Sequence, residues 1–196
     1  MEDIKSFLII HNVAKKHNVG SIIRSAAAMN VFEIWVVGKR KLASFGNQGT
    51  AKRVIYRNFL GLSEVKDYAE ANLIQIIGVE IMETSKSIWT CPFSTSTAFF
   101  MGNEGTGMDD AEKEICHGFV YIPQYNSNTE SLNVSVAAGI ILSHFAHWAG
   151  FQESKIQGEK FEVSDKTGIQ AMMARAEEIR AERAKKRALE SLSNPS

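Results

Sequence analysis

Three polar loops, each between an apolar run and a helical pattern, carry the side chains in this sequence that could do chemistry. The first is "HNVGSIIRSAAAMN", residues 17–30, and it contains Asn18 and Arg24. Asn is a preferred helix N-cap, which predicts that Asn18 caps the coming helix. Arg24 is the only charged residue between Asn18 and Val31. An arginine in such apolar surroundings binds an anion or forms a structural ion pair, and both interpretations stay open.

The second loop is the glycine turn of "FFMGNEGTGM", residues 99–108. Gly102, Gly105 and Gly107 have the spacing G-x-x-G-x-G, which matches neither the dinucleotide fingerprint nor a Walker A loop. Glu104 would repel a phosphate about 4 Å away by roughly 4 kcal/mol per charge pair at an effective dielectric near 20. The turn therefore favours a cofactor without phosphates, and the alternative is a plain β-turn.

The third loop is "YIPQYNSNTESLNVSVAAG", residues 121–139, where Ser131 and Asn133 precede an almost wholly apolar helix. The N-terminus of a helix presents free amides and a partial positive charge, which favour a carboxylate or a carbonyl. The structural alternative is that Ser131 is a simple N-cap.

Short, nearly continuous apolar runs alternate with helical patterns along the chain. The runs cover residues 7–13, 33–38, 73–82, 96–102 and 118–124, and the helical patterns cover 21–30, 63–72, 108–117 and 132–149. Continuous apolar runs are typical of strands buried on both faces. The sequence therefore predicts an α/β fold, with a mainly parallel sheet and helices on both faces. Ligands bind at the carboxyl ends of such strands, where the three loops converge.

Charge is unevenly distributed although the 196-residue chain has a net charge of zero. Residues 1–60 hold ten Lys and Arg against three Asp and Glu, whereas residues 61–130 hold three against eleven. A basic loop suited to a polyanion, or a solvated loop without a partner, is predicted from Lys39, Arg40, Lys41, Lys52, Arg53 and Arg57.

The cysteines and the apolar stretches exclude several classes of protein. Cys91 and Cys116, the two cysteines, lack the spacing of a zinc site or a disulfide framework, and we expect no metal. No apolar stretch reaches the roughly 20 residues of a membrane span, and the first residues do not resemble a secretory signal. We therefore expect a soluble, intracellular and cytoplasmic protein without a membrane partner, with the nucleus or an organelle as the open alternative.

The composition changes after residue 150, which divides the chain into a main domain at 1–150 and an appendage at 151–196. The appendage contains "TGIQAMMARAEEIRAERAKKRALESL", a run rich in Ala, Glu, Arg and Lys. This composition predicts a charged helix, either solvated or in contact with RNA.

The three loops together resemble the motifs of the SpoU family of the SPOUT superfamily, the RNA ribose 2′-O-methyltransferases. The segments "NVGSIIRSAAAMNVFEIWVVG", "FFMGNEGTGM" and "VYIPQYNSNTESLNVSVAAGI" match its three motifs in order. The resemblance implies a C-terminal trefoil knot, bound S-adenosylmethionine and a homodimer.

The resemblance also assigns roles to individual residues. It places five residues at the family's active-site positions, namely Asn18, Arg24, Glu104, Ser131 and Asn133. It places three others where backbone groups contact the cofactor, namely Gly102, Ile122 and Leu132, and Gly107 belongs to the same turn. Glu80 is a candidate for the cofactor's ribose hydroxyls, with a solvated glutamate as the alternative.

We therefore expect methylation of a ribose 2′-hydroxyl in RNA, with transfer RNA preferred over ribosomal RNA. A catalytically silent RNA-binding protein of the same fold is the rival hypothesis. It would be expected to have lost Arg24, Glu104 or Asn133, all of which are present. A nucleotide-dependent oxidoreductase or NTPase would need a phosphate-binding motif, which the sequence lacks.

Overall fold

The computed structural model describes residues 4–13, 15–38, 54–103, 105–161 and 181. The chain divides into two compact units, Met1–Gln152 and Glu153–Ser196. Glu104, the predicted basic loop apart from Arg57, and the predicted charged helix apart from Ala181 lie outside the described residues.

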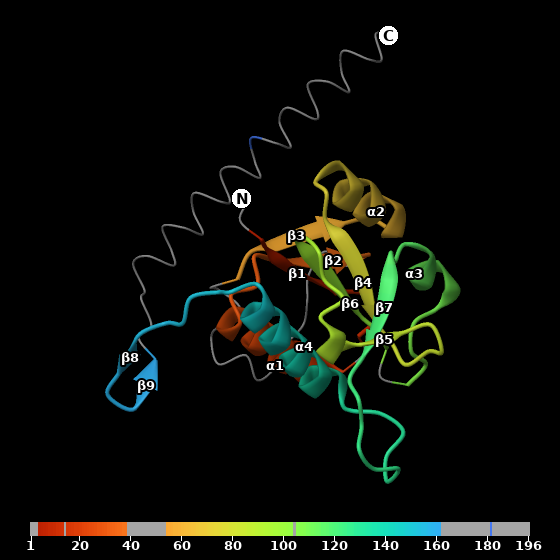
Figure 1. The fold of residues 1–196 in the computed structure, drawn as a ribbon. Coiled ribbons are helices and arrows are strands. Elements are labelled where there is room, and N and C mark those ends of the chain that lie inside the picture. The colour runs from red at the N-terminus through yellow and green to blue at the C-terminus, as the bar shows by residue number, and fades with distance from the viewer. Residues whose placement is uncertain (1–3, 14, 39–53, 104, 162–180, 182–196) are drawn as a thin grey trace. The chain divides into compact units, whose positions relative to one another are not determined.

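A seven-stranded sheet forms the centre of the first unit, in the order β3-β2-β1-β6-β4-β7-β5 (Figure 1). Its strands are β1 (Ser6–Ile10), β2 (Glu33–Val37), β3 (Tyr56–Phe59), β4 (Gln75–Val79), β5 (Lys86–Ser87), β6 (Thr97–Met101) and β7 (Gly118–Tyr121). Every pair of neighbouring strands is parallel. All residues of β1, β2 and β6 are buried, as their continuous apolar runs predict.

Helices cover both faces of this sheet and bury a separate apolar core on each (Figure 1). The helices are α1 (Lys16–Ala28), α2 (Leu62–Ala71), α3 (Asp110–Glu114), α4 (Val134–Trp148) and the 3₁₀ turn η2 (Ile88–Thr90). One core packs α1 and α4 against the sheet, and the other contains α2 residues and the segment around α3. The predicted α/β fold with a mainly parallel sheet and helices on both faces is confirmed.

The element boundaries differ from the predicted ones at several places, and two strands of the sheet have no predicted counterpart. The helix α1 begins at Lys16 instead of residue 21 because the polar residues before the Ile pair already take helical conformation. The strands β3 and β5 were not predicted, since β3 is half polar and β5 has only two residues.

Arg57 does not belong to a basic loop, and this prediction is wrong. It lies on β3 with 6% of its surface exposed. Its Nε and Nη2 donate to Oε2 and Oε1 of Glu33 at 2.8 and 3.0 Å. The indole Nε1 of Trp35 donates to the same carboxylate at 3.1 Å, and the guanidinium lies 4.3 Å from the ring centre of Tyr68. This buried network accounts for the charge of Arg57 without an external anion.

The described part of the second unit contains a short antiparallel pair, β8 (Ile156–Gln157) and β9 (Lys160–Phe161). The independent domain status of residues 151–196 stays a prediction, and so does the trefoil knot. Among the helices of the described residues, none has the length and apolar character needed to cross a membrane.

Candidate functional site

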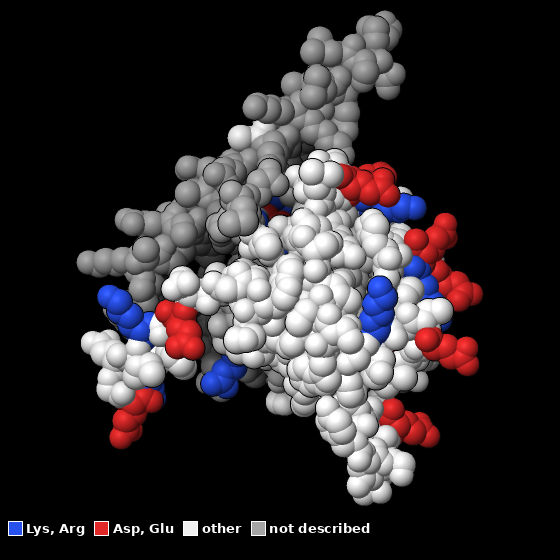
Figure 2. All heavy atoms as spheres, in the orientation of Figure 1, with Lys and Arg blue, Asp and Glu red and all other residues white. Residues whose placement is uncertain are grey.

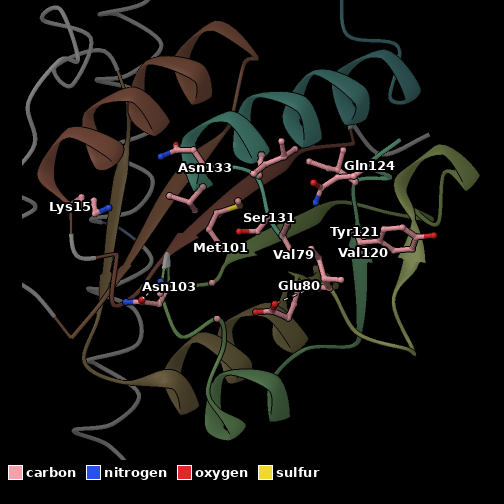
Figure 3. A pocket seen from close by; sticks show the side chains of 18 residues that line it. Lys15, Val79, Glu80, Met101, Asn103, Val120, Tyr121, Gln124, Ser131 and Asn133 are labelled. Carbon is pink, nitrogen blue, oxygen red and sulfur yellow. Dashed lines mark hydrogen bonds between the residues drawn. The ribbon is translucent and has the colours of Figure 1, made fainter. Parts of the chain in front are cut away.

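A pocket of about 330 Å³ opens at the carboxyl ends of β4, β6 and β7, beside the start of α4 (Figure 3). It brings together loops that are far apart in the sequence, as expected for an open parallel sheet. Seven of the ten predicted site residues line it: Glu80, Gly102, Gly107, Ile122, Ser131, Leu132 and Asn133.

Asn133 joins the first and third loops at the edge of this pocket. Its Oδ1 accepts from the backbone N of Ser135 at 2.9 Å, which makes Asn133 the N-cap of α4. Its Nδ2 donates to Oδ1 of Asn18 at 3.2 Å. The cap fixes the orientation of the Asn133 amide, and the bond to Asn18 holds the start of α1 against the start of α4.

Two predictions about helix caps are therefore wrong. Asn18 is not an N-cap, because α1 begins at Lys16 and Asn18 lies in its first turn, buried. Ser131 does not cap α4 either, because the helix begins at Val134 and Asn133 takes that position. Ser131 is exposed, and its carbonyl accepts from the hydroxyl of Thr129 at 3.0 Å.

The glycine turn is held by its own asparagine. Asn103 and Gly107 exchange two backbone hydrogen bonds, of 3.2 and 3.1 Å. Oδ1 of Asn103 accepts from the backbone N of Gly105 at 2.8 Å and of Thr106 at 3.3 Å. Its Nδ2 donates to the carbonyl of Asn12 at 2.7 Å, which ties the turn to the loop after β1. The described amides of the turn, those of residues 103 and 105–107, are thus occupied within the turn and do not form a phosphate cradle.

Glu80 holds the far end of this turn. Its Oε2 accepts from the backbone N of Met108 at 2.8 Å, and Oε1 accepts from that of Ile81 at 3.1 Å. Gly107 has a φ of +68°, and a Cβ placed there would lie 2.6 Å from Oε2 of Glu80. Glycine is required at this position both by the left-handed backbone and by the approach of the carboxylate. Each carboxylate oxygen has further acceptor capacity that a hydroxyl in the pocket can use.

Arg24 lies on the exposed side of α1 and does not line the pocket of its own chain. The buried positions of α1 are those around Ile22, Ile23 and Ala26, so position 24 points away from that core. The lone arginine of an apolar helix is therefore a surface residue in the single chain. The roles assigned to the ten residues stay predictions.

Sequence reasoning missed Asn103, Lys15 and Gln124, which also line the pocket. Asn103 could have been found because Asn before glycine stabilises turns through its side chain. It also missed a pair at the end of β1, where Nδ1 of His11 lies 2.6 Å from Oε1 of Glu112. Glu112 is buried and closes the capping box of α3 with Asp109. No local pattern links residues 11 and 112, which meet only through the fold.

The described residues include no cluster of three or more His, Cys, Asp or Glu side chains that could hold a metal ion. The polar groups around the pocket are mainly amides, hydroxyls and backbone groups. Such a lining suits a neutral or hydroxyl-bearing organic ligand with an apolar part.

Two curated relatives of the chain are named as 23S rRNA methyltransferases. The chain is 35% identical over 146 residues to the 23S rRNA (guanosine-2′-O-)-methyltransferase RlmB of Neisseria meningitidis, covering 69% of this chain and 56% of that protein. It is 32% identical over 142 residues to RlmB of Acinetobacter baylyi, with the same two coverages. The chain thus spans little more than half the length of these relatives.

Solved structures with the same fold include the SpoU methyltransferase AviRb from Streptomyces viridochromogenes in complex with AdoMet. It matches with a TM-score of 0.65 and 26% identity, covering 77% of this chain and 60% of that one. The A. aeolicus TrmH/SpoU tRNA modifying enzyme matches with a TM-score of 0.66 and 23% identity, covering 91% and 89% of the two chains. Residues 5–143 match the model of the SpoU rRNA Methylase family. This chain, whose second and third motif loops line one pocket and whose first is hydrogen-bonded to the pocket edge through Asn18, belongs to the SpoU rRNA methylase family.

Proposed function

We propose that this protein transfers the methyl group of S-adenosylmethionine to a ribose 2′-hydroxyl in RNA. The observation that carries the proposal is that the second and third family motifs line one pocket, while the Asn18–Asn133 hydrogen bond ties the first motif to its edge. The AdoMet-bound relative AviRb and the names of the RlmB proteins support the cofactor and the type of reaction.

The pocket residues fit such a cofactor. A volume of about 330 Å³ lies within the range of small-molecule sites. Apolar side chains, among them Met101, Ile122 and Leu132, suit an adenine ring, and the Glu80 carboxylate can accept from ribose hydroxyls. At Gly102 a Cβ would lie 3.1 Å from both Oε2 of Glu80 and Cγ of Met108. A cofactor can therefore approach the backbone closely at this position only because the residue is glycine.

When bound, the cofactor would supply an electrophilic methyl group on a sulfonium. The chain's own contribution is then to align the acceptor hydroxyl and to stabilise the oxygen as its proton leaves. The capped amide of Asn133, fixed by Asn18, is suited to positioning. A guanidinium stays protonated and is a poor base. Arg24 would therefore bind a phosphate of the RNA and stabilise the developing alkoxide.

Ribosomal RNA is the substrate class that we propose. From the sequence we expected transfer RNA. The names of the relatives favour 23S ribosomal RNA instead. The tRNA modifying enzyme among the similar structures is 23% identical, which supports the fold alone. An RNA substrate also implies an intracellular location.

A homodimer would bring Arg24 to a pocket. The helix α4 has no Lys, Arg, Asp or Glu, and Val136 on it is 50% exposed. Figure 2 shows that the face over α4 is largely without charged side chains, which gather beside α2 and α3. An apolar, uncharged helix face favours burial against another subunit. Arg24, exposed on the neighbouring helix α1, could then serve the pocket of the second subunit.

Radioactive methyl transfer tests the reaction. The purified protein is incubated with tritiated S-adenosylmethionine and unmodified transcripts of 23S rRNA or of tRNA, and the product nucleoside is identified by mass spectrometry. We expect 2′-O-methylation of the 23S transcript. Cofactor binding in calorimetry without transfer to any RNA would support the catalytically silent alternative, and absence of cofactor binding would overturn the proposal.

Arg24 variants test its role and its subunit. Arg24→Lys keeps the charge but loses the bidentate geometry, and we expect kcat to fall by about 10²-fold. Dimers of one Arg24→Ala and one Asn133→Ala subunit, isolated with two affinity tags, should retain about half of the wild-type activity, because one intact site remains if Arg24 acts across the interface. Inactive mixed dimers would place Arg24 in its own subunit's site.

A further inference from the structure

His11 forms a hydrogen bond close to the glycine turn that no motif assigns. Its Nδ1 lies 2.6 Å from Oε1 of Glu112, and the two side chains are 21% and 2% exposed. An ionised carboxylate can only accept a hydrogen bond, so Nδ1 is assigned as the donor. His11 directly follows β1, and Glu112 lies on α3. The bond therefore joins two segments that are 101 positions apart in the sequence.

The first of these segments holds the near end of the turn. Asn12, the residue after His11, has a left-handed backbone with a φ of +54°, and its carbonyl accepts from Nδ2 of Asn103 at 2.7 Å. A left-handed backbone at a residue other than glycine persists where the surrounding contacts hold it. The side chain of His11 supplies such a contact one residue before this carbonyl.

The second segment holds the far end of the turn. Oε2 of Glu112 accepts from the backbone N of Asp109 at 2.9 Å, which fixes the start of α3. The residue before it, Met108, donates its backbone N to Oε2 of Glu80 at 2.8 Å. Both ends of the turn are therefore tied to segments that meet at the bond between His11 and Glu112.

These contacts form a closed ring around a wall of the pocket. The turn lines the pocket with Asn103, Gly105 and Gly107, whereas His11 and Glu112 are not among the described lining residues. A buried ionic or polar pair adds little net stability compared with apolar residues of similar volume, but it can fix one arrangement of the segments that it joins. The pair is therefore suited to setting the shape of this wall.

We propose that His11 is a positioning residue for the cofactor, which holds the glycine turn through Asn12 on one side and Glu112 on the other. This inference rests on the proposed function, because it deepens the description of the same site. Without the bond, the turn would take several arrangements, and only some of them would receive the cofactor. The apparent affinity for a ligand falls in proportion to the fraction of the protein that is competent to bind it.

His11→Leu removes the donor and tests the inference by two measurements. S-adenosylmethionine should bind about tenfold more weakly in calorimetry, because a hydrogen bond to a charged group is lost. In the protein without ligand, amide hydrogen exchange followed by mass spectrometry should become about tenfold faster in peptides covering residues 101–110. Nδ2 of an asparagine can donate from nearly the position of Nδ1, so His11→Asn should restore most of both properties.

His117→Leu is the matched control. Nδ1 of His117 accepts from the backbone N of Ile76 at 3.0 Å, just before β7 and at the end of this strand that is opposite the pocket. Loss of this bond should lower the free energy of unfolding in urea titrations but leave the exchange of the turn and the cofactor affinity unchanged.

Two results would overturn the inference. In the first, His11→Leu keeps the wild-type exchange rate and the wild-type cofactor affinity. In the second, His11→Leu and His117→Leu change both properties equally, which is the result of a general loss of stability. A wild-type protein that binds no S-adenosylmethionine would instead overturn the proposed function. Faster exchange of the turn in His11→Leu alone would then still support the hold of His11 on the turn.

Discussion

Two regions of this molecule use polar side chains in opposite ways. Against α2, the carboxylate of Glu33 is surrounded by the guanidinium of Arg57 and the indole of Trp35, with Tyr68 against the guanidinium. Glu33 and Arg57 are 2% and 6% exposed. The charges of Glu33 and Arg57 are paired with each other inside the protein. The network can therefore specify packing but does not bind a ligand.

At the carboxyl edge of the sheet the polar groups hold backbone instead. Glu80 accepts from two backbone amides, Asn103 closes the glycine turn, and Asn133 caps α4. These bonds fix loops and leave further donor and acceptor capacity directed at the pocket. We interpret the buried charges as specifying the packing of the fold, and we propose that the half-exposed amides and the Glu80 carboxylate serve binding.

Breaking the buried network should have the largest effect on stability. Arg57→Ala leaves the Glu33 carboxylate buried and unpaired, which should lower the free energy of unfolding by about 3–5 kcal/mol in urea titrations. The double variant Glu33→Gln with Arg57→Met should lose much less. Lys113→Ala is the control, since its pair with Asp110 is 3.9 Å long and exposed, and it should change stability by less than about 1 kcal/mol. A single variant no less stable than the double one would contradict the comparison.

A methyl group in the glycine turn should affect the pocket more than the fold. In Gly107→Ala the left-handed backbone is strained by about 1–2 kcal/mol, and the new Cβ displaces the Glu80 carboxylate. We expect S-adenosylmethionine affinity to fall about tenfold or more in calorimetry. Gly105→Ala is matched, because among the described residues its Cβ would meet only Oδ1 of Asn103, at 3.7 Å. If both variants lose the same cofactor affinity, displacement of the Glu80 carboxylate is not the cause of the loss.

Variants of Asn133 can separate its role as the N-cap of α4 from its proposed role in methyl transfer. Asn133→Asp keeps the acceptor for the Ser135 amide but loses the donor to Asn18. We therefore expect the free energy of unfolding to change by less than about 0.5 kcal/mol, whereas the rate of methyl transfer should fall. Asn133→Ala loses both and should cost about 1 kcal/mol of stability. Urea titrations and initial rates measure the two effects. An active Asn133→Asp variant would mean that Asn18 turns its amide to donate instead.

The sequence was sufficient to predict the layers of the fold because its strands are continuous apolar runs with both faces buried. It was also sufficient to predict that the three loops meet, since carboxyl ends of parallel strands share one edge. It failed for β3, where Arg57 and Asn58 interrupt the apolar pattern although Arg57 is buried by a partner 24 residues away.

Within the site, the residue types were predictable and their bonding was not. Asn18 and Asn133 are separated by 115 positions, so nothing local indicates that one amide caps a helix and also donates to the other. The cap of α4 depends on where the helix begins, and a shift of two residues moves that role from Ser131 to Asn133. Glu80 was a weak candidate because its clamp on Met108 requires the folded turn.

The smallest expected effect concerns Cys116, on the same side of the sheet as the buried network. Burial, and secondarily the charge of Glu112, raises the pKa of its thiol from 9.0 to about 12. The folded state therefore keeps this proton while the unfolded state releases it, so the stability from this group is complete below pH 9 and is lost as pH rises toward 12. Burial raises the pKa of Tyr56 from 10.0 to about 12, which adds a loss above pH 10. Cys116→Ala should flatten the fall in unfolding free energy between pH 9 and 10, measured by urea titration against wild type, and leave methyl transfer at neutral pH unchanged. A changed transfer rate would mean that this side of the sheet acts on the site as well as on stability.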